Sequence, residues 1–244
     1  MKTILELTNF MSAYGNLYKA FKNDKEYHVF GINDEVDFQV EMVGITNIKT
    51  VTDADLNKID EIRIWYHSKN TNETIFMAIV VMLLAEYSQK IRLIDVRKTG
   101  VKRKFASSVG SFNGDELFSM QLFANNLTNL KYRYCEKIVN YYYRRNELSD
   151  SFMMVNGNTI HELSHSDIKQ FILEKFIDST FPSHIIGIVM GHEWEEKGWC
   201  FGDNIIYKFV IDLINEGLIK IESSFYEDYD MPPKLAPNNI SNGL

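Results

Sequence analysis

The stretch Glu61–Val96, EIRIWYHSKNTNETIFMAIVVMLLAEYSQKIRLIDV, decides the fold that the sequence predicts. Two short apolar runs rich in β-branched residues, 62–65 and 91–96, have the composition of strands. Between them, Asn70 is a good N-cap and Glu73 lies three residues later, the spacing of a capping box at a helix start. A strand, a crossover helix and a parallel strand form the basic unit of an α/β sheet. We therefore predict an α/β fold with a parallel, Rossmann-like sheet and flanking helices.

The segment between these strands is apolar on nearly every side of the predicted helix, from residue 75 to residue 84. Such a helix is enclosed, either by a sheet and other helices or by a partner subunit, so the sequence leaves a homo-oligomer open. The longest apolar run, 75–85, has 11 residues, which is too short to cross a bilayer. We therefore expect a buried helix and no membrane as a partner.

Composition and cysteine content are typical of an ordinary soluble protein with one large domain or two small ones. The 244 residues are 45% hydrophobic and 24% charged. Cys135 and Cys200 are too few for a disulfide framework, which favours a reducing compartment. The apolar start after Lys2 is interrupted by Glu6, so no signal peptide is predicted. We expect a cytoplasmic location.

The formal charge of −7 is unevenly distributed along the chain. Residues 1–150 hold 20 Lys and Arg against 19 Asp and Glu, which gives +1. Residues 151–244 hold 6 against 14, which gives −8. An acidic half is a poor match to a phosphate backbone, so we expect that nucleic acid is not a partner.

Loops that follow predicted strands carry the candidate ligand-binding residues. A strand at 3–7 leads into a helix for which Ser12 is a good N-cap, and a strand at 27–32 leads into an acidic loop. Ligands of open α/β sheets collect at the carboxyl ends of the strands, where the positive end of a helix can bind an anion. We therefore expect a small anionic ligand in a crevice at this edge. The candidate residues are Asn9, Ser12, Asp34, Trp65, His67 and Glu73.

These candidates also have a structural interpretation. The loop after the first strand lacks the GxGxxG and GxxxxGK(S/T) spacings, so an ordinary turn is the simpler interpretation there. Trp65 could pack, His67 could be solvated, and Glu73 could only cap its helix. The basic run 97–104, RKTGVKRK, could contact phosphate, although a short run with a glycine is typical of an exposed loop.

The second half of the chain predicts a different kind of domain. A helix over 128–145 interleaves tyrosines and basic residues, which fits nucleic acid but fits a connecting helix better. Beyond it, two short strands flank the turn Asn156–Gly157, helices follow, and Gly217 ends the last helix before a strand. This order predicts a small α+β, winged-helix-like domain. The predicted segments are an α/β domain at 1–125, a linking helix at 126–149, the α+β domain at 150–228 and a disordered tail at 229–244.

Residues 161–165, HELSH, match the HExxH spacing of zinc hydrolases. On a helix this spacing places both histidines on one face around a metal, with the glutamate as general base. Here the motif follows an Asn-Gly turn, so its first half should be a strand, and Ser164 or Ser166 should cap the next helix. We therefore predict no metal site, and the sequence assigns neither catalytic residues nor a cofactor.

Several segments together resemble a bacterial family, the domain of unknown function eighteen thirty-five, followed by its C-terminal companion, the domain of unknown function thirty-six fifty-eight. The first resemblance rests on LTNFMSAYGNLYKAF (7–21), VFGIND (29–34), IRIWYH (62–67), NTNETI (70–75) and SVGSFNGDEL (108–117). The second rests on SFMMVNGNTIHEL (151–163) and GDNIIYKFVIDLINEGLIKIE (202–222). The family has no established activity, so the resemblance implies a two-domain architecture and no particular chemistry.

Three functions are consistent with these patterns. The leading hypothesis is a cytosolic small-ligand-binding or regulatory protein with its crevice at the carboxyl edge of the sheet. An enzyme acting on a nucleotide or a phosphorylated metabolite is the second, and it requires His67 and Glu73 to converge on one pocket. A winged-helix-like regulator that binds nucleic acid is the third, and the −8 charge of residues 151–244 argues against it.

Overall fold

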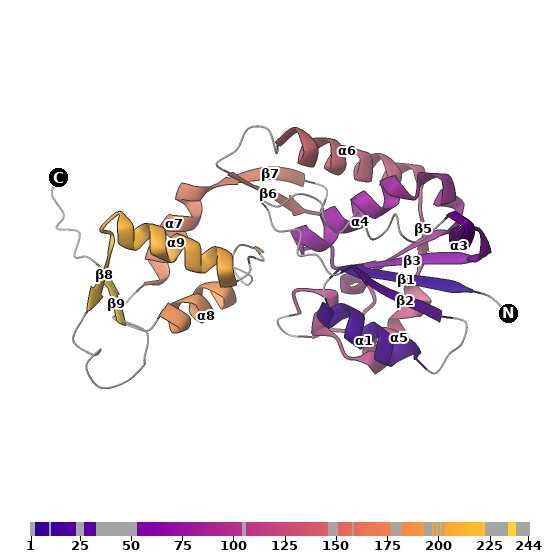
Figure 1. Ribbon diagram of the computed structural model, residues 1–244, viewed down its shortest axis with the longest axis horizontal. Coiled ribbons are helices and arrows are strands. Elements are labelled where there is room, and N and C mark those ends of the chain that lie inside the picture. The colour runs from indigo at the N-terminus through magenta and orange to yellow at the C-terminus, as the bar shows by residue number, and fades with distance from the viewer. Residues whose placement is uncertain are drawn as a thin grey trace. The chain divides into compact units, whose positions relative to one another are not determined.

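The computed structural model of the chain divides into two compact units, and each is described by itself (Figure 1). The first unit comprises Met1–Ser149 and Met153–His161, and the second comprises Asp150–Phe152 and Glu162–Leu244. The structure describes residues 3–9, 11–22, 27–32, 53–103, 106–145, 151–157, 159–176, 182–192, 197, 199, 201, 203–222 and 234–237.

A mostly parallel sheet forms the centre of the first unit, which confirms the predicted α/β fold. Its strand order is β2-β1-β3-β4-β5, and every neighbouring pair is parallel except β4 and β5. The short antiparallel edge strand β5 was not predicted. The strands are β1 (Ile4–Asn9), β2 (Tyr27–Ile32), β3 (Glu61–Tyr66), β4 (Ile91–Asp95) and β5 (Asn125–Asn126).

One face of the sheet is covered by α4 (Thr71–Leu83), on which α6 (Asn129–Arg145) packs in turn. Side chains at alternate strand positions, such as Ile62 and Ile64, join the apolar residues of both helices in one core. The short helix α3 (Asp53–Lys58) adds Leu56 to it. The apolar helix that the sequence left open to a partner subunit is therefore enclosed by its own chain, and the predicted linking helix is part of this unit.

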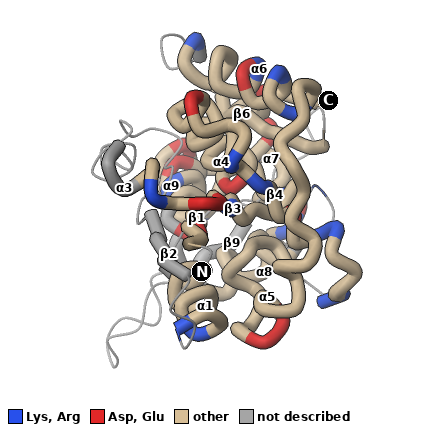
Figure 2. The backbone as a smooth tube through the Cα atoms, turned by 90° about the vertical axis from the view of Figure 1, so that its right-hand side faces the viewer, with Lys and Arg blue, Asp and Glu red and all other residues tan. Residues whose placement is uncertain are grey.

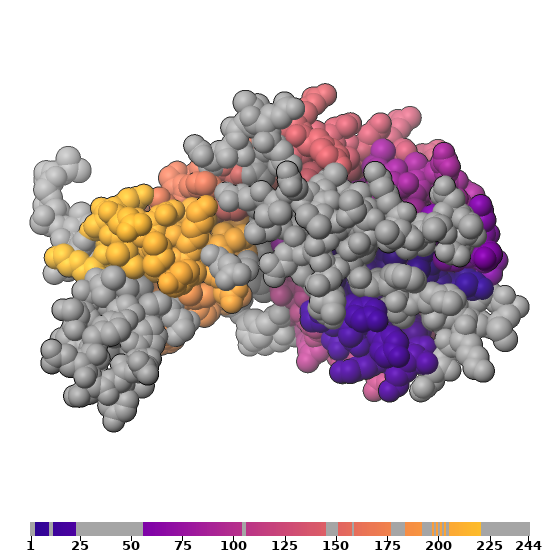
Figure 3. Space-filling view, in the orientation of Figure 1, coloured from indigo at the N-terminus to yellow at the C-terminus, as the bar shows by residue number. Residues whose placement is uncertain are grey.

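The opposite face is covered by α1 (Met11–Phe21) and α5 (Gly114–Met120), which pack against each other. α1 also forms part of the outer surface (indigo in Figure 3). The basic end of α1 and the acidic start of α5 are visible as blue and red segments in Figure 2. Trp65 lies in the core beneath these helices, is fully buried, and has its ring 6.4 Å from that of Phe21.

Buried charged residues interrupt the apolar residues on this same face. Because β1 pairs with β3 in the register that places Glu6 opposite Arg63, the two side chains meet, with Arg63 Nη1 3.1 Å from Glu6 Oε1. Arg63 Nε lies 2.6 Å from Glu61 Oε1. Trp65 Nε1 donates a hydrogen bond to the other oxygen of Glu6. The carboxylate of Glu6, which is fully buried, is thus held by two donors.

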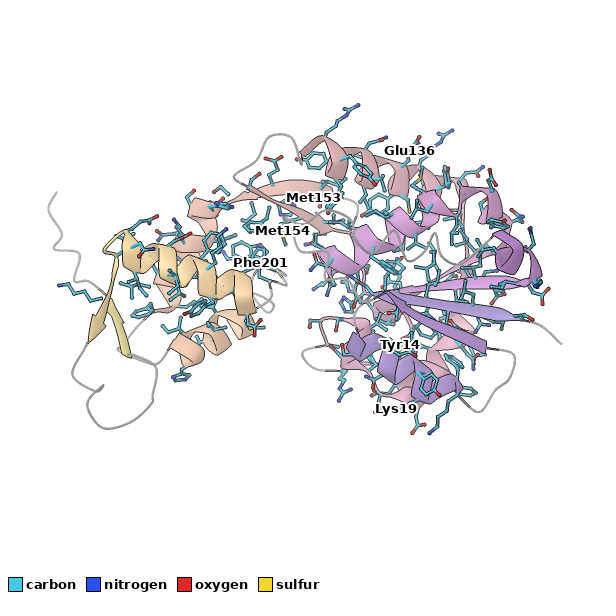
Figure 4. The ribbon with its side chains drawn as sticks, viewed as in Figure 1. Tyr14, Lys19, Glu136, Met153, Met154 and Phe201 are labelled. Carbon is cyan, nitrogen blue, oxygen red and sulfur yellow. The ribbon has the colours of Figure 1, made fainter. Side chains whose placement is uncertain are left out.

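The second unit is a small α+β unit with an aromatic core. The Phe152 ring lies 5.3 Å from that of Phe201, which Figure 4 labels, and 5.8 Å from that of Phe209. Two strands flanking the turn at Gly157, whose φ of 61° is accessible to glycine, confirm the predicted hairpin. The hairpin strands β6 (Ser151–Asn156) and β7 (Thr159–Ser164) are divided between the units, because Met153–His161 belongs to the first. The elements that lie wholly in the second unit are α7 (His165–Lys175), α8 (Pro182–His192), α9 (Asp203–Asn215), β8 (Ile219–Glu222) and β9 (Lys234–Pro237).

One predicted boundary in this half needs correction. β9 pairs antiparallel with β8, so residues 234–237 form a strand inside the segment predicted to be a disordered tail. Of the two serines predicted to cap the next helix, Ser164 is the N-cap of α7, which begins at His165, and it forms a capping box with Asp167. Within the described ranges, no helix combines the length and the apolarity that crossing a membrane requires.

Candidate functional site

The carboxyl ends of three adjacent parallel strands place polar residues at one edge of the sheet. β1 ends at Asn9, β3 is followed by His67, and β4 ends at Asp95. All three residues are buried, with exposed fractions of 0%, 4% and 7% respectively. This is the edge at which ligands bind in open α/β sheets, and it is the edge that the sequence analysis selected.

Glu73 ties the surrounding loops together. One carboxylate oxygen accepts the backbone N–H of His67 at 2.7 Å, and the other accepts that of Val109 at 2.9 Å. Burial raises the pKa of Glu73 to about 8, although these two hydrogen bonds act in the opposite direction. Asn70 caps α4 by accepting the backbone N–H of Glu73 at 3.1 Å, as predicted. Glu73 is therefore a structural tether that accepts one backbone N–H at each oxygen.

Asp95 joins the loop after β3 to the loop after β4. Its Oδ1 accepts the backbone N–H of Ser68 at 3.1 Å and that of Arg97 at 3.3 Å, and its Oδ2 lies 3.4 Å from Lys98 Nζ. The two loops are thereby fixed side by side. The two loops carry three basic residues, Lys69, Arg97 and Lys98, and the backbone of all three is therefore located at this edge.

His67 is neutral in this environment. Burial is the main reason why its pKa falls to about 4, and the charges of Arg97 and Lys69 act in the same direction. Its Nδ1 accepts the backbone N–H of Lys69 at 3.3 Å, which assigns the ring proton to Nε2. A buried neutral imidazole of this kind contributes a hydrogen-bond donor rather than a charge.

An unsatisfied hydroxyl lies in the same loop. The Ser68 hydroxyl is buried and has no hydrogen-bond partner in the part of the chain that the structure describes. A buried polar group without a partner is unusual in a folded protein and is a common feature of ligand and water sites. Together with the nearby cations, this hydroxyl gives the edge the donors that a small anion needs.

The structure brings four of the six predicted site residues to this edge. Asn9, His67 and Glu73 lie there directly. Ser12 lies next to the segment that Glu73 holds. Val109 of that segment donates its backbone N–H to Glu73, and the next residue, Gly110, is so close to Ser12 that a Cβ added to it would lie 2.4 Å from Ser12 Oγ. α1 begins at Met11, so Ser12 is an exposed residue of its first turn and not its N-cap.

The other two predicted site residues are not part of the described site. Trp65 was predicted to line the crevice together with Ser12, and this was wrong, because its side chain is fully buried in the core beneath α1. Strand alternation explains the error: Trp65 points to the opposite face from its neighbour Tyr66. Asp34 lies outside the described residues.

Asp95, Ser68 and Lys131 were not predicted. A signal for Asp95 was present, because it is the polar end of a predicted strand, like Asn9. Lys131 comes from α6 and lies 5.1 Å from the ring centroid of Tyr66, the residue that ends β3. Nothing in the sequence places α6 beside this strand end, so no local pattern could have found it.

The HExxH motif does not form one helical face. His161 belongs to β7, whereas His165 is the first residue of α7, with its ring 5.2 Å from those of both Phe152 and Phe209. The predicted strand is thus confirmed. In the described ranges, no cluster of three or more His, Cys, Asp or Glu side chains has the arrangement of a metal site.

No protein-family model matches the chain, and no curated protein matches it either.

Proposed function

We propose that the chain binds a small anionic ligand at the carboxyl edge of its parallel sheet, as a cytoplasmic binding or regulatory protein. The observation that carries the proposal is the pair of backbone hydrogen bonds to Asp95, which gathers Lys69, Arg97 and Lys98 at one edge. These three cations are accompanied by the carboxylate of Asp95 and by Glu73, whose pKa burial raises. The excess of positive charge favours an anion.

A hydroxyl at this edge supports the same proposal. The Ser68 hydroxyl is buried without a hydrogen-bond partner among the described residues. α4 begins directly after this loop, so the positive end of its macrodipole faces the same place. Positioned donors combined with flexible cations are typical of sites for phosphate and carboxylate groups.

Calorimetric titration of the full chain with inorganic pyrophosphate and with citrate, at low ionic strength, tests this proposal. Arg97→Met and Lys69→Met should each weaken binding about tenfold, because each removes one charge-assisted contact. Arg97 provides its backbone N–H to Asp95, so its side chain can be replaced without breaking that bond.

Lys19→Met is the matched control. Lys19 is exposed in the last turn of α1 and is labelled in Figure 4, and it should not affect binding. If neither anion binds the wild type, or if Lys19→Met weakens binding as much as Arg97→Met, the proposal is wrong.

Two finer interpretations are part of the same proposal. The order α7, α8, α9 and an antiparallel strand pair supports a winged-helix-like second unit, which is consistent with the resemblance to the two domains of unknown function. We assign this unit a regulatory role without nucleic acid, because residues 151–244 carry 14 acidic against 6 basic residues. Tight, salt-sensitive binding of random duplex DNA by the full chain would contradict this assignment.

A further inference from the structure

Lys131 has an unusual environment beside the proposed site. Its ammonium group lies 4.6 Å from the ring centroid of Tyr134 and 5.1 Å from that of Tyr66. Tyr134 is itself fixed, because its phenol donates a hydrogen bond to the carbonyl of Gly157 in the turn between β6 and β7. The two rings therefore hold the ammonium group through cation–π contacts at the end of β3.

No carboxylate lies within ion-pair distance of Lys131 among the described residues. Aromatic faces stabilise a cation but accept no conventional hydrogen bond, so the three N–H donors of this group stay available. Tyr66 lies opposite Asp95 in the register of β3 and β4, so Lys131, which lies over the Tyr66 ring, and Lys98, which lies 3.4 Å from Asp95, are both at these strand ends. Burial lowers the pKa of Lys131. Burial raises the pKa of both tyrosines, so neither phenol supplies a negative charge at neutral pH.

Asp95 is paired with Lys98 at this position, and the Lys131 ammonium group lies over the Tyr66 ring without a carboxylate partner among the described residues. Asp95 already accepts two backbone N–H groups and lies 3.4 Å from Lys98 Nζ. An ammonium group acts as a compact point charge with three donors. Two such groups at neighbouring strand ends favour a ligand group with two negative charges, such as a phosphate, over a group with one.

We propose that Lys98 and Lys131 form a subsite for a phosphate group, so the ligand of this edge is a small phosphorylated molecule. The inference rests on the proposed anion site and names the class of its ligand. In this arrangement Lys131 reaches the ligand from α6, while Lys98 reaches it from the loop after β4. Tyr66 and Tyr134 act as positioning residues that keep the Lys131 ammonium group in place.

Competitive acetylation of the wild-type chain by acetic anhydride tests the subsite without any variant. The rate is followed at each lysine by peptide mass spectrometry, with and without inorganic pyrophosphate. Pyrophosphate should slow acetylation of Lys98 and Lys131 about tenfold, because a bound anion favours the protonated form of the amine and covers it, and only the neutral amine reacts. Lys19 and Lys137, both exposed, serve as internal controls and should react at unchanged rates.

The pattern of protection separates this inference from the proposed function. Protection of Lys69 without protection of Lys131 would overturn the subsite and leave the anion site standing. No protection at any of these lysines would overturn both. Adenosine diphosphate and ribose 5-phosphate, used in parallel, distinguish a nucleotide from a sugar phosphate. Citrate tests the phosphate itself: if it protects Lys131 as strongly as pyrophosphate does, the assignment of a phosphate is overturned.

Variants on α6 provide an independent measurement. Lys131→Met should weaken pyrophosphate binding about tenfold, whereas Lys131→Arg, which keeps the charge, should recover most of it. Lys137→Met, on the same helix, should bind like the wild type. Equal affinity of Lys131→Met and Lys137→Met would overturn the subsite.

Discussion

Trp65 donates the hydrogen bond from its indole nitrogen to Glu6, and both side chains are completely buried between the sheet and α1. The same carboxylate accepts from Arg63, so a charged cluster lies inside the core of the first unit. Burial raises the pKa of Glu6 to about 7, although Arg63 and Trp65 both oppose this shift. The cluster therefore connects the stability of the sheet to pH.

The free energy of unfolding should fall as pH rises from about 4.5 to about 7 because of Glu6. Below pH 4.5 the Glu6 carboxyl group is protonated in both the folded and the unfolded chain. Between pH 4.5 and pH 7 the unfolded chain loses this proton while the folded chain keeps it. Replacing the group by an amide removes this titration. The difference in unfolding free energy between wild type and Glu6→Gln should change by about 3 kcal/mol across this window.

Urea denaturation at several pH values measures this difference. The contributions of the other titrating groups cancel, because the wild type and Glu6→Gln both contain them. Glu86→Gln is the control, since Glu86 is exposed in the turn before β4. Parallel pH profiles for the wild type and Glu6→Gln would show that Glu6 does not titrate in this window.

Arg63 and Arg92 form a matched pair for testing the buried charges. They are neighbours in the register of β3 and β4. The Arg63 side chain is 10% exposed and contacts both Glu6 and Glu61. The Arg92 side chain is 27% exposed and lies 3.9 Å from Glu61. Arg63→Met should destabilise the chain by about 3 to 5 kcal/mol, because it leaves buried carboxylates unpaired. Arg92→Met should cost about 1 kcal/mol. Equal losses in denaturation experiments would mean that burial does not set the difference.

Glu73→Ala should loosen the site loops and destabilise the chain by about 2 to 4 kcal/mol, because the backbone N–H groups of His67 and Val109 lose their buried acceptors. Hydrogen exchange measured by NMR should accelerate at these two amides first. Glu86→Ala, an exposed site, should leave both exchange rates unchanged. Unchanged protection at Val109 in Glu73→Ala would show that another group holds this segment.

Gly110 and Gly15 should respond in opposite directions to substitution by alanine. A Cβ at Gly110 would meet Ser12 Oγ at 2.4 Å and the backbone nitrogen of Ala13 at 3.3 Å, so Gly110→Ala should cost about 1 to 3 kcal/mol. At Gly15, inside α1, nothing lies within 4 Å, so Gly15→Ala should stabilise by up to about 1 kcal/mol. Thermal unfolding measures both.

Ser12→Gly provides the second arm of that experiment. Removing the serine side chain should restore part of the stability lost in Gly110→Ala, because the nearest clashing atom is then absent. A double variant as unstable as Gly110→Ala alone would mean that the backbone contact, not the hydroxyl, excludes a side chain there.

Local patterns were sufficient to predict the four parallel strands of the sheet but not the short strand β5, because periodicity and capping act within a few residues. Asn70 does cap α4 through the backbone N–H of Glu73. The expected return bond from Glu73 to its cap is absent from the described interactions, because its carboxylate binds His67 and Val109 instead. Val109 lies 36 residues further along the chain, and no local pattern shows which loop will pack there.

The strand ends that carry the candidate residues were predicted, whereas the side chains that meet there were predicted only in part. Asn9, His67 and Glu73 follow from the rule that ligands bind at carboxyl strand ends. The error at Trp65 concerns which face its side chain occupies, and the partner that holds it, Glu6, depends on the register between β1 and β3. Lys131 depends on the packing of α6 against α4, which is a tertiary contact.

The HELSH motif should bind no zinc in the purified protein. A zinc hydrolase needs two histidines one helical turn apart on the same face, together with a third ligand and an open position for water. Here His161 is in β7, and Glu162 follows it in the strand, so the two side chains point to opposite faces. His165 begins α7 with its ring against Phe152 and Phe209.

Elemental analysis of untagged protein should therefore give the same low zinc content for wild type and His161→Ala. About one zinc per chain that disappears in His161→Ala would require a different conformation of this segment.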